Sequence, residues 1–117
     1  MGVNGTLSAL AEPNRMRIVE MLRTGSRSVN EIVMELELPQ PLVSKHLRVL
    51  RNAGLVRVRP HAQQRVYELQ PGPFAELDTW VSSFRRLWED RLDTLDDYLQ
   101  EMKRSRHPGK QPRIRKR

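Results

Sequence analysis

Apolar residues recur with helical spacing in two groups at the start of the chain. The first group, within residues 7–11, predicts a short helix that ends before Pro13, because the residue preceding a proline disfavours the helical conformation. Pro13 itself is compatible with the first turn of another helix. The second group, within residues 16–22, predicts that next helix, and Gly25 supplies a stop after it.

A capping motif predicts the start of a third helix. In Ser28-Val29-Asn30-Glu31, the serine can accept hydrogen bonds from free backbone amides, and the glutamate stands three residues further on. The third helix is therefore expected from Val29 to about Glu37. Leu38-Pro39-Gln40-Pro41 then breaks the helical pattern.

A fourth helix is predicted after this break. Val43, Leu47 and Leu50 lie at positions i, i+4 and i+7, which gives the helix one apolar face and leaves a polar, basic face. Asn52-Ala53-Gly54 is expected to end it.

Two alternating segments come next, at residues 55–59 and 65–69, and Pro60 to Gln64 is the predicted turn between them. Pro60 is acceptable only at the end of a strand. Two helices followed by a hairpin predict a winged helix-turn-helix, a mainly α fold with a small β-hairpin. Such a unit can place a helix in the major groove of DNA and the hairpin near the adjacent backbone or minor groove.

A long amphipathic helix is predicted from Phe74 to Met102, after Pro71-Gly72-Pro73. Apolar residues follow two heptad positions over four heptads, and Arg91 is the one charged interruption. The apolar stripe is wider than a two-helix seam requires, so part of it is expected to pack on the domain itself and part on a partner. We expect a homodimer formed by the first and last helices, with interface residues Leu7, Leu10, Phe74, Leu77, Trp80, Val81, Phe84 and Trp88.

Two of these residues leave an alternative open. Trp80 and Trp88 could line a ligand pocket between subunits, although a plain apolar interface is the simpler interpretation.

Residues 1–102 are predicted to form one domain, and residues 103–117 a disordered basic tail. The whole chain has a net charge of +7, but the tail holds eight Lys or Arg and no acid. Residues 1–102 hold 13 basic and 14 acidic residues. The tail could raise DNA affinity through counterion release or could simply be solvated.

Within residues 1–102, positive charge is concentrated on the predicted DNA-binding unit. Residues 39–70 hold six basic side chains and one acid, whereas residues 71–102 hold three basic and eight acidic ones. The positive face is therefore expected on the fourth helix and the hairpin.

The composition limits the chemistry of the protein. The absence of cysteine excludes disulfides, thiolate metal ligands and thiol redox sensing. No apolar run reaches the roughly 18 residues of a membrane span, and the start lacks signal-peptide features, so a cytoplasmic protein is expected. The chain has no cysteine nucleophile, no phosphate-binding glycine loop and no grouped histidine and carboxylate set, so an enzyme is not expected. We expect no cofactor.

The candidates for DNA contact lie on the fourth helix and the hairpin. Gln40 can pair with adenine, Pro41 can touch a thymine methyl, and Lys45 or Arg48 can bind guanine or phosphate. His46 could contact DNA, bind a metal or pack below the helix, and DNA contact is the preferred hypothesis. The alternative for both groups is an ordinary solvated surface. The full set is Gln40, Pro41, Ser44, Lys45, His46, Arg48, Arg51, Arg57, Arg59, Gln63, Gln64 and Arg65.

Three segments resemble the ArsR/SmtB family of bacterial transcription regulators: Leu7 to Ile18, Leu42 to Leu50, and Ala53-Gly54-Leu55-Val56, with Arg65-Val66-Tyr67 at the hairpin. The resemblance covers roughly residues 5–100. It implies a homodimeric repressor whose first and last helices form the interface and whose fourth helix enters the major groove of a palindromic operator.

The chain departs from the metal-sensing members of that family. Residues 31–35 contain no cysteine, and residues 74–102 contain acids but no histidine to complete a zinc site. Residues 84–92 resemble a subgroup without the metal motifs, often encoded beside small lipid-binding-fold proteins. Metal sensing is therefore not expected, and abundance, a protein partner or an unknown effector would regulate the protein.

Two functions remain to be compared. The first is a sequence-specific, autoregulatory repressor that binds double-stranded DNA as a homodimer. The second is a protein-interaction adaptor that uses the winged helix and the long amphipathic helix to hold another protein. Salt-dependent binding to one inverted repeat would exclude the adaptor.

Overall fold

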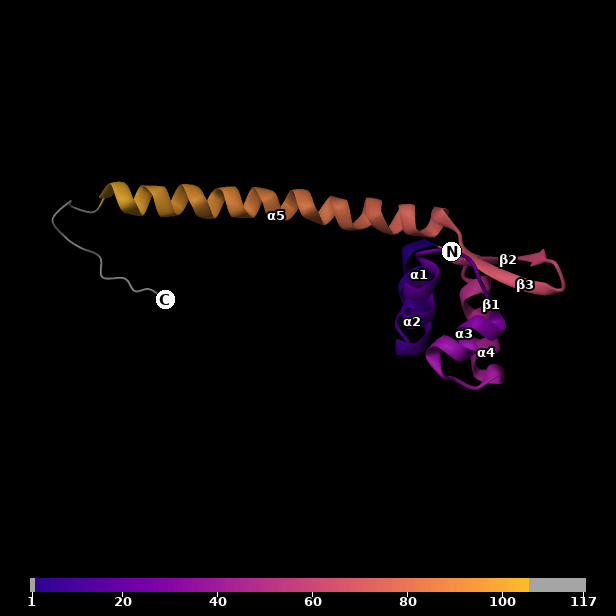
Figure 1. Cartoon of the computed structure of the whole chain (residues 1–117). Helices are drawn as coiled ribbons and strands as arrows, with labels where there is room; N and C mark the ends of the chain where they lie inside the picture. Colours follow the sequence, from indigo (N-terminus) through magenta and orange to yellow (C-terminus); the bar gives the residue numbers. More distant parts are fainter. Residues whose placement is uncertain (1, 106–117) are drawn as a thin grey trace. The chain divides into compact units, whose positions relative to one another are not determined.

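The structure, a computed structural model, describes residues 2–105, and within them the chain forms five helices and three strands (Figure 1). The elements are α1 (Gly2–Leu10), α2 (Pro13–Leu22), β1 (Arg27–Ser28), α3 (Val29–Leu36), α4 (Gln40–Asn52), β2 (Val56–His61), β3 (Gln64–Leu69) and α5 (Pro71–Ser105). The predicted mainly α fold with a small hairpin is confirmed. The chain divides into two compact units, one up to Trp80 and one from Val81 onward.

The junction between α1 and α2 follows the sequence prediction. The break falls at Glu12, and Pro13 occupies the first turn of α2. The Glu12 side chain caps this helix, because its Oε1 accepts a hydrogen bond from the Arg15 backbone N–H at 2.9 Å. One of the amides that have no partner within the helix is thereby satisfied.

The predicted capping box at the start of α3 is present in full. The backbone N–H of Glu31 donates to Ser28 Oγ at 3.1 Å, and the backbone N–H of Ser28 donates to Glu31 Oε1 at 2.7 Å. Ser28 is buried, so water cannot replace its hydroxyl as an acceptor. The box fixes the start of α3 directly after β1.

We expect Ser28→Ala to lower the free energy of unfolding by about 1 kcal/mol, the typical cost of losing an N-cap side chain. Urea denaturation monitored by circular dichroism would measure it. Ser8→Ala, at an exposed position in α1, serves as the control and should leave the midpoint unchanged. Equal midpoints for the Ser28 variant and the native protein would show that the cap contributes nothing.

The link between α3 and α4 is shorter than predicted. Glu37 ends α3 in a left-handed conformation with φ of 55°, and α4 already begins at Gln40. Gln40 and Pro41 therefore belong to the helix and not to the break. Proline is tolerated there because a first-turn amide needs no helical partner. Pro39 stands at the N-cap and provides no side-chain hydrogen bond.

The sheet contains a third strand that the sequence pattern did not indicate. Its order is β1-β3-β2, and both pairings are antiparallel. His61 pairs with Gln64, so only Ala62 and Gln63 form the turn, and the predicted turn from Pro60 to Gln64 is wrong in extent. Pro60 lies inside β2, which is an edge strand and can accommodate a residue without an N–H.

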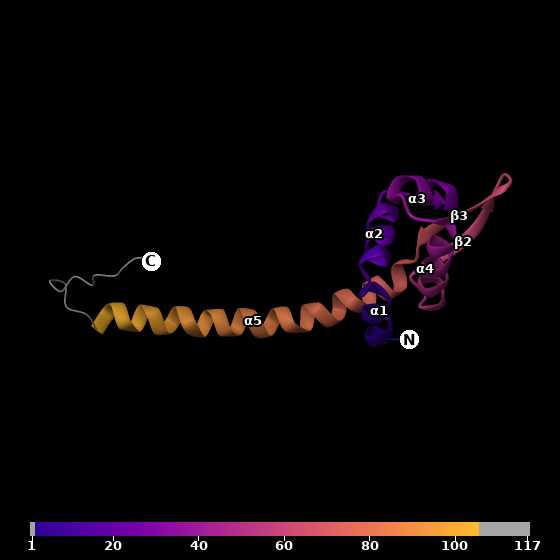
Figure 2. The same ribbon diagram turned by 90° about the horizontal axis from the view of Figure 1, so that it is seen from below.

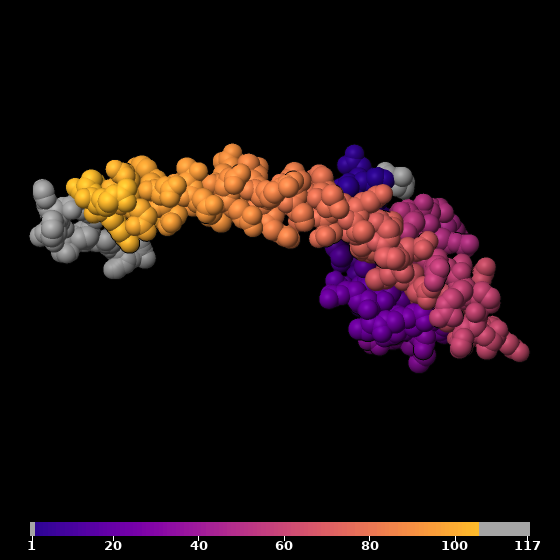
Figure 3. Space-filling model, turned by 90° about the horizontal axis from the view of Figure 1, so that it is seen from above, coloured from indigo at the N-terminus to yellow at the C-terminus, as the bar shows by residue number. Residues whose placement is uncertain are grey.

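The core of the first unit lies between the helices and the base of the sheet. The predicted apolar face of α4 is confirmed, since Val43, Leu47 and Leu50 are all buried. They pack in one cluster with residues of α2, α3 and β2, including Ile18 and Ile32. The β2–β3 hairpin extends beyond these helices (Figure 2) and forms a narrow projection at the edge of the unit (Figure 3).

The helix α5 is longer at both ends than the sequence pattern predicted. It starts at Pro71, so Pro71-Gly72-Pro73 forms its first turn and not a separator, again because a first turn tolerates proline. It continues three residues beyond Met102, and Lys103 and Arg104 in its last turn complement the helix dipole. The remainder of the predicted tail, residues 106–117, lies outside the described residues. None of the described helices has the length and apolar character needed to cross a membrane.

Candidate DNA-binding surface

The helix α4 presents a polar face opposite its buried one. Pro41, Lys45 and Arg48 are exposed and lie at i, i+4 and i+7, on the side away from Val43 and Leu47. The flank of this face carries exposed Gln40 and Arg51 and half-buried Ser44. These six predicted contact residues therefore share one side of the helix, and we call them the α4 face.

The α4 face is electropositive. The helix contains no acidic residue, and it carries Lys45, Arg48 and Arg51. Among residues 2–105, none of these three side chains has an ion pair or hydrogen-bond partner. Their charges are therefore available for an external anion such as phosphate.

His46 is the exception among the predicted contacts, because it does not lie on this surface. It is 6% exposed and points from α4 toward the N-terminal end of α2. Its position in the helix explains this, since His46 precedes Leu47 by one residue and so borders the apolar face. The prediction that His46 contacts DNA is corrected: it belongs to the interior.

A polar cluster holds His46 in place. An Arg15 Nη1 donates toward His46 Nδ1 at 3.5 Å, so Nδ1 is the accepting nitrogen. His46 Nε2 lies 3.7 Å from Glu12 Oε1, too far for a hydrogen bond, and has no hydrogen-bond partner among the described residues. Arg15 Nε donates to the Ala9 backbone oxygen at 2.6 Å. The cluster joins the end of α1, the start of α2 and the middle of α4.

The environment of Glu12 favours its ionised form. The backbone N–H of Arg15 donates to the carboxylate and lowers the pKa of Glu12 below its ordinary value of 4.5, and the Arg15 charge acts in the same direction against desolvation. A lowered folded-state pKa adds stability above the unfolded-state pKa, and this stability is lost as pH falls through the folded-state value.

We therefore expect Glu12→Gln to be less stable than the native protein at pH 7, with the difference disappearing as the pH is lowered below 4.5. Urea midpoints at a series of pH values would measure this. Glu76→Gln, at an exposed position of α5, is the control and should follow the native curve at every pH. A difference that persists unchanged at acidic pH would assign the loss to packing rather than to charge.

The hairpin carries the second group of predicted contacts. Gln63, Gln64 and Arg65 are exposed at and beside its tip. Further down, Arg57 and Arg59 lie on one face of β2, because side chains two residues apart in a strand share a face. Both pair with Glu68 of β3: Arg57 Nε lies 2.6 Å from Oε2, and Arg59 Nε lies 3.1 Å from Oε1. The two arginines, Arg57 first, lower the pKa of Glu68 below 4.5.

The eight predicted dimer residues differ in their environment. Leu10 and Phe74 pack against the core of the first unit, and Leu77 is half-buried. The other five, Leu7, Trp80, Val81, Phe84 and Trp88, are between 39% and 61% exposed. Further along α5, Leu92, Leu95, Tyr98 and Leu99 are also exposed large apolar residues. The helix thus presents an apolar stripe to solvent in the isolated chain, and dimerisation through it stays a prediction.

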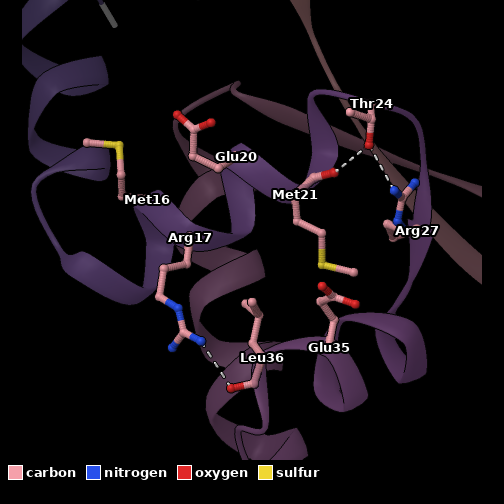
Figure 4. A pocket seen from close by; sticks show the side chains of 8 residues that line it. All are labelled: Met16, Arg17, Glu20, Met21, Thr24, Arg27, Glu35 and Leu36. Carbon is pink, nitrogen blue, oxygen red and sulfur yellow. Dashed lines mark hydrogen bonds between the residues drawn. The ribbon is translucent and has the colours of Figure 1, made fainter.

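A groove of about 470 Å³ is lined by residues between Met16 and Leu36 and by none of the α4 face (Figure 4). Both arginines of the groove donate hydrogen bonds to uncharged oxygens. An Arg17 Nη donates to the Leu36 backbone oxygen, and an Arg27 Nη donates to Thr24 Oγ1. The first of these bonds ties α2 to the end of α3. The lining residues are Met16, Arg17, Glu20, Met21, Thr24, Arg27, Glu35 and Leu36.

Within residues 2–105, no group of three or more His, Cys, Asp or Glu side chains is arranged to hold a metal ion. The acids of α5 are spread along the helix without a histidine among them. The described structure therefore offers no donor set of the kind that zinc requires.

The comparisons with known proteins agree with this arrangement. Residues 12–58 match the family model described as bacterial regulatory protein, arsR family. The chain is 43% identical over 76 residues to the HTH-type transcriptional regulator Rv2034 of Mycobacterium tuberculosis, covering 65% of this chain and 71% of that protein. It is 46% identical over 63 residues to the HTH-type transcriptional repressor SmtB of the same species, covering 54% of this chain and 47% of SmtB.

A solved structure gives the same result. A possible transcriptional regulator for arsenical resistance superimposes with a TM-score of 0.61 at 38% identity, over 78% of this chain and 92% of that one. The similarity thus extends over most of this chain.

Proposed function

Because the chain belongs to the arsR family of bacterial transcriptional regulators, we propose that it is a homodimeric repressor that binds an inverted-repeat operator. The observation that carries the proposal is the α4 face, whose three basic side chains have no partner within residues 2–105. A helix with one buried face and one unpaired basic face suits insertion into the major groove.

The proposed contacts divide by chemistry. On α4, Gln40, Lys45 and Arg48 would reach base edges or phosphates, with Pro41, Ser44 and Arg51 beside them. On the hairpin, Gln63, Gln64 and Arg65 would reach the neighbouring backbone or minor groove, together with Arg57 and Arg59. His46 takes no part in contact with DNA and supports α4 from within.

The twofold symmetry of the proposed dimer requires a DNA site with matching twofold symmetry. Two copies of α4 related by a twofold axis would enter successive major grooves about 34 Å apart, which requires an inverted repeat. We assign the interface to α1 and α5, where Leu7, Trp80, Val81 and Trp88 are exposed in the single chain. Burying them against a second copy would remove apolar surface from water.

Repression would follow from exclusion of polymerase at the occupied promoter, including the promoter of the protein's own gene. Such a regulator acts at the chromosome, so the proposal includes a cytoplasmic location. Release requires a ligand or protein partner that binds the DNA-incompetent dimer more tightly than the DNA-bound form, since equal affinity shifts no population.

An adaptor function is the second candidate, because α5 presents an apolar stripe that a partner protein could cover. It predicts association with protein but no preference for one DNA sequence. The α4 face argues against it, since an adaptor has no need for three unpaired basic side chains on one helix.

Binding to DNA from upstream of the protein's own gene tests the proposal. The purified protein would be titrated against that DNA and against a scrambled duplex at about 150 mM salt, where non-specific attraction is screened. Protection of an inverted repeat with two chains per site would support the repressor. Equal, weak binding to both duplexes would refute operator recognition and favour the adaptor.

A further inference from the structure

We propose that Glu68 is a positioning residue for DNA binding: it holds Arg57 and Arg59 as a pair on the hairpin and limits the attraction of the hairpin for DNA of arbitrary sequence. The inference rests on the proposed function, in which the hairpin approaches the DNA backbone. It assigns a role in specificity to an acidic residue on an otherwise basic surface.

The register of the hairpin creates the arrangement. Arg57 is the direct cross-strand partner of Glu68, and Arg59 follows two residues later on the same face of β2. Each carboxylate oxygen accepts from a different arginine, Oε2 from Arg57 and Oε1 from Arg59. The carboxylate therefore bridges the two guanidinium groups.

The bridge leaves the outer part of each guanidinium available. Both hydrogen bonds use Nε, and an arginine has four further N–H donors on its two Nη atoms. The arginine side chains are 60% and 47% exposed, whereas the Glu68 side chain is 21% exposed. The acid is thus less exposed than either arginine, and four N–H donors on each guanidinium group have no partner in these two bonds.

The charge of this trio is lower than that of the two arginines alone. The two arginines hold the pKa of Glu68 below 4.5, so the carboxylate is ionised at neutral pH and the trio carries a net charge of +1. Non-specific affinity for DNA depends on how many phosphates the protein neutralises. Glu68 therefore reduces the sequence-independent part of binding while it orders the side chains that contribute to it.

Arg65 gives an internal contrast on the same hairpin. It pairs with Pro60 across the strands, which places it on the opposite face from Arg57 and Glu68. Its side chain is exposed and has no ion-pair partner among residues 2–105. Pairing with an acidic side chain is thus specific to Arg57 and Arg59 and does not extend to every basic residue of the hairpin.

Glu68→Gln is the test, because it removes the charge and keeps the shape. We expect affinity for a scrambled duplex to rise about three- to tenfold at 150 mM salt, and its logarithmic salt dependence to steepen by about 0.9, the value of one added phosphate contact. Operator affinity should rise less, so the ratio of operator to scrambled affinity falls. Glu68→Asp keeps the carboxylate and should retain the native salt dependence.

Glu20→Gln is the matched control. Glu20 also pairs with an exposed arginine, Arg23 at 2.7 Å, but on α2. Glu20→Gln removes the same charge, and one arginine ion pair, from another part of the surface. If Glu68→Gln and Glu20→Gln give the same affinities and salt dependence, the inference is wrong. A fall in affinity of Glu68→Gln for both duplexes would also overturn it.

The failure of this inference is distinguishable from failure of the proposed function. If the native protein does not prefer the operator over the scrambled duplex, operator recognition fails. The salt dependence on the scrambled duplex still reports whether Glu68 restrains the two arginines.

Discussion

Replacing both Lys45 and Arg48 by alanine is expected to lower operator affinity by about 100-fold or more. A basic side chain that contacts a base contributes roughly 1–3 kcal/mol, and about 1.4 kcal/mol corresponds to a factor of ten. Both residues are exposed and have no ion-pair partner within residues 2–105, so their loss should not affect folding. Fluorescence anisotropy with labelled operator would measure the affinity, and thermal unfolding would measure the fold.

The matched control is Lys103→Ala with Arg104→Ala. It removes one lysine and one arginine, the same change of net charge, from the last turn of α5. A loss of operator affinity in this control as large as that of the α4 double variant would mean that net charge, rather than the α4 face, determines binding. Retained affinity in the α4 variant would remove α4 as the recognition helix.

Trp88→Glu with Leu95→Glu is expected to convert the proposed dimer to a monomer. Operator affinity should then fall by about 10²- to 10⁴-fold, because the two half-sites would no longer be bound by one linked molecule. These side chains are 61% and 51% exposed in the single chain, and they occupy the same heptad position on α5. Analytical ultracentrifugation would give the oligomeric state of the variant.

The control for this variant is Thr79→Glu with Gln100→Glu. It adds the same negative charge to α5 at heptad positions opposite the apolar stripe, so the dimer should persist. If the Trp88 and Leu95 variant remains a dimer, the interface lies elsewhere and the assignment to α5 is refuted. If it becomes a monomer with unchanged operator affinity, dimerisation is not needed for recognition.

The elements that local sequence specifies could be predicted well. The apolar spacing of Val43, Leu47 and Leu50 defined both α4 and its buried face, and the capping box at Ser28 located the start of α3 to the residue. These features depend on contacts within one or two helical turns. The exposed face of α4 followed directly from the buried one.

The features that depend on pairing across the chain could not be predicted. The strand β1 has two residues and no pattern of its own, and it exists because β3 offers Val66 and Tyr67 as partners. The pairing of Glu68 with Arg57 required the register of the hairpin, which a two-residue turn sets and a longer predicted turn obscured. His46 has a polar side chain at the border of the apolar face of α4. Its burial is stabilised by a hydrogen bond from Arg15, which lies 31 residues earlier in the chain.

Arg15 has a mechanical consequence for regulation. One guanidinium group holds the carbonyl end of α1 through Ala9 and the middle of α4 through His46. Ala9 also belongs to the apolar core, so a displacement of α1 would reach α4 both through this guanidinium group and through side-chain packing. If the proposed release of DNA begins with a movement of α1, Arg15 is thus one route by which that movement would reach α4.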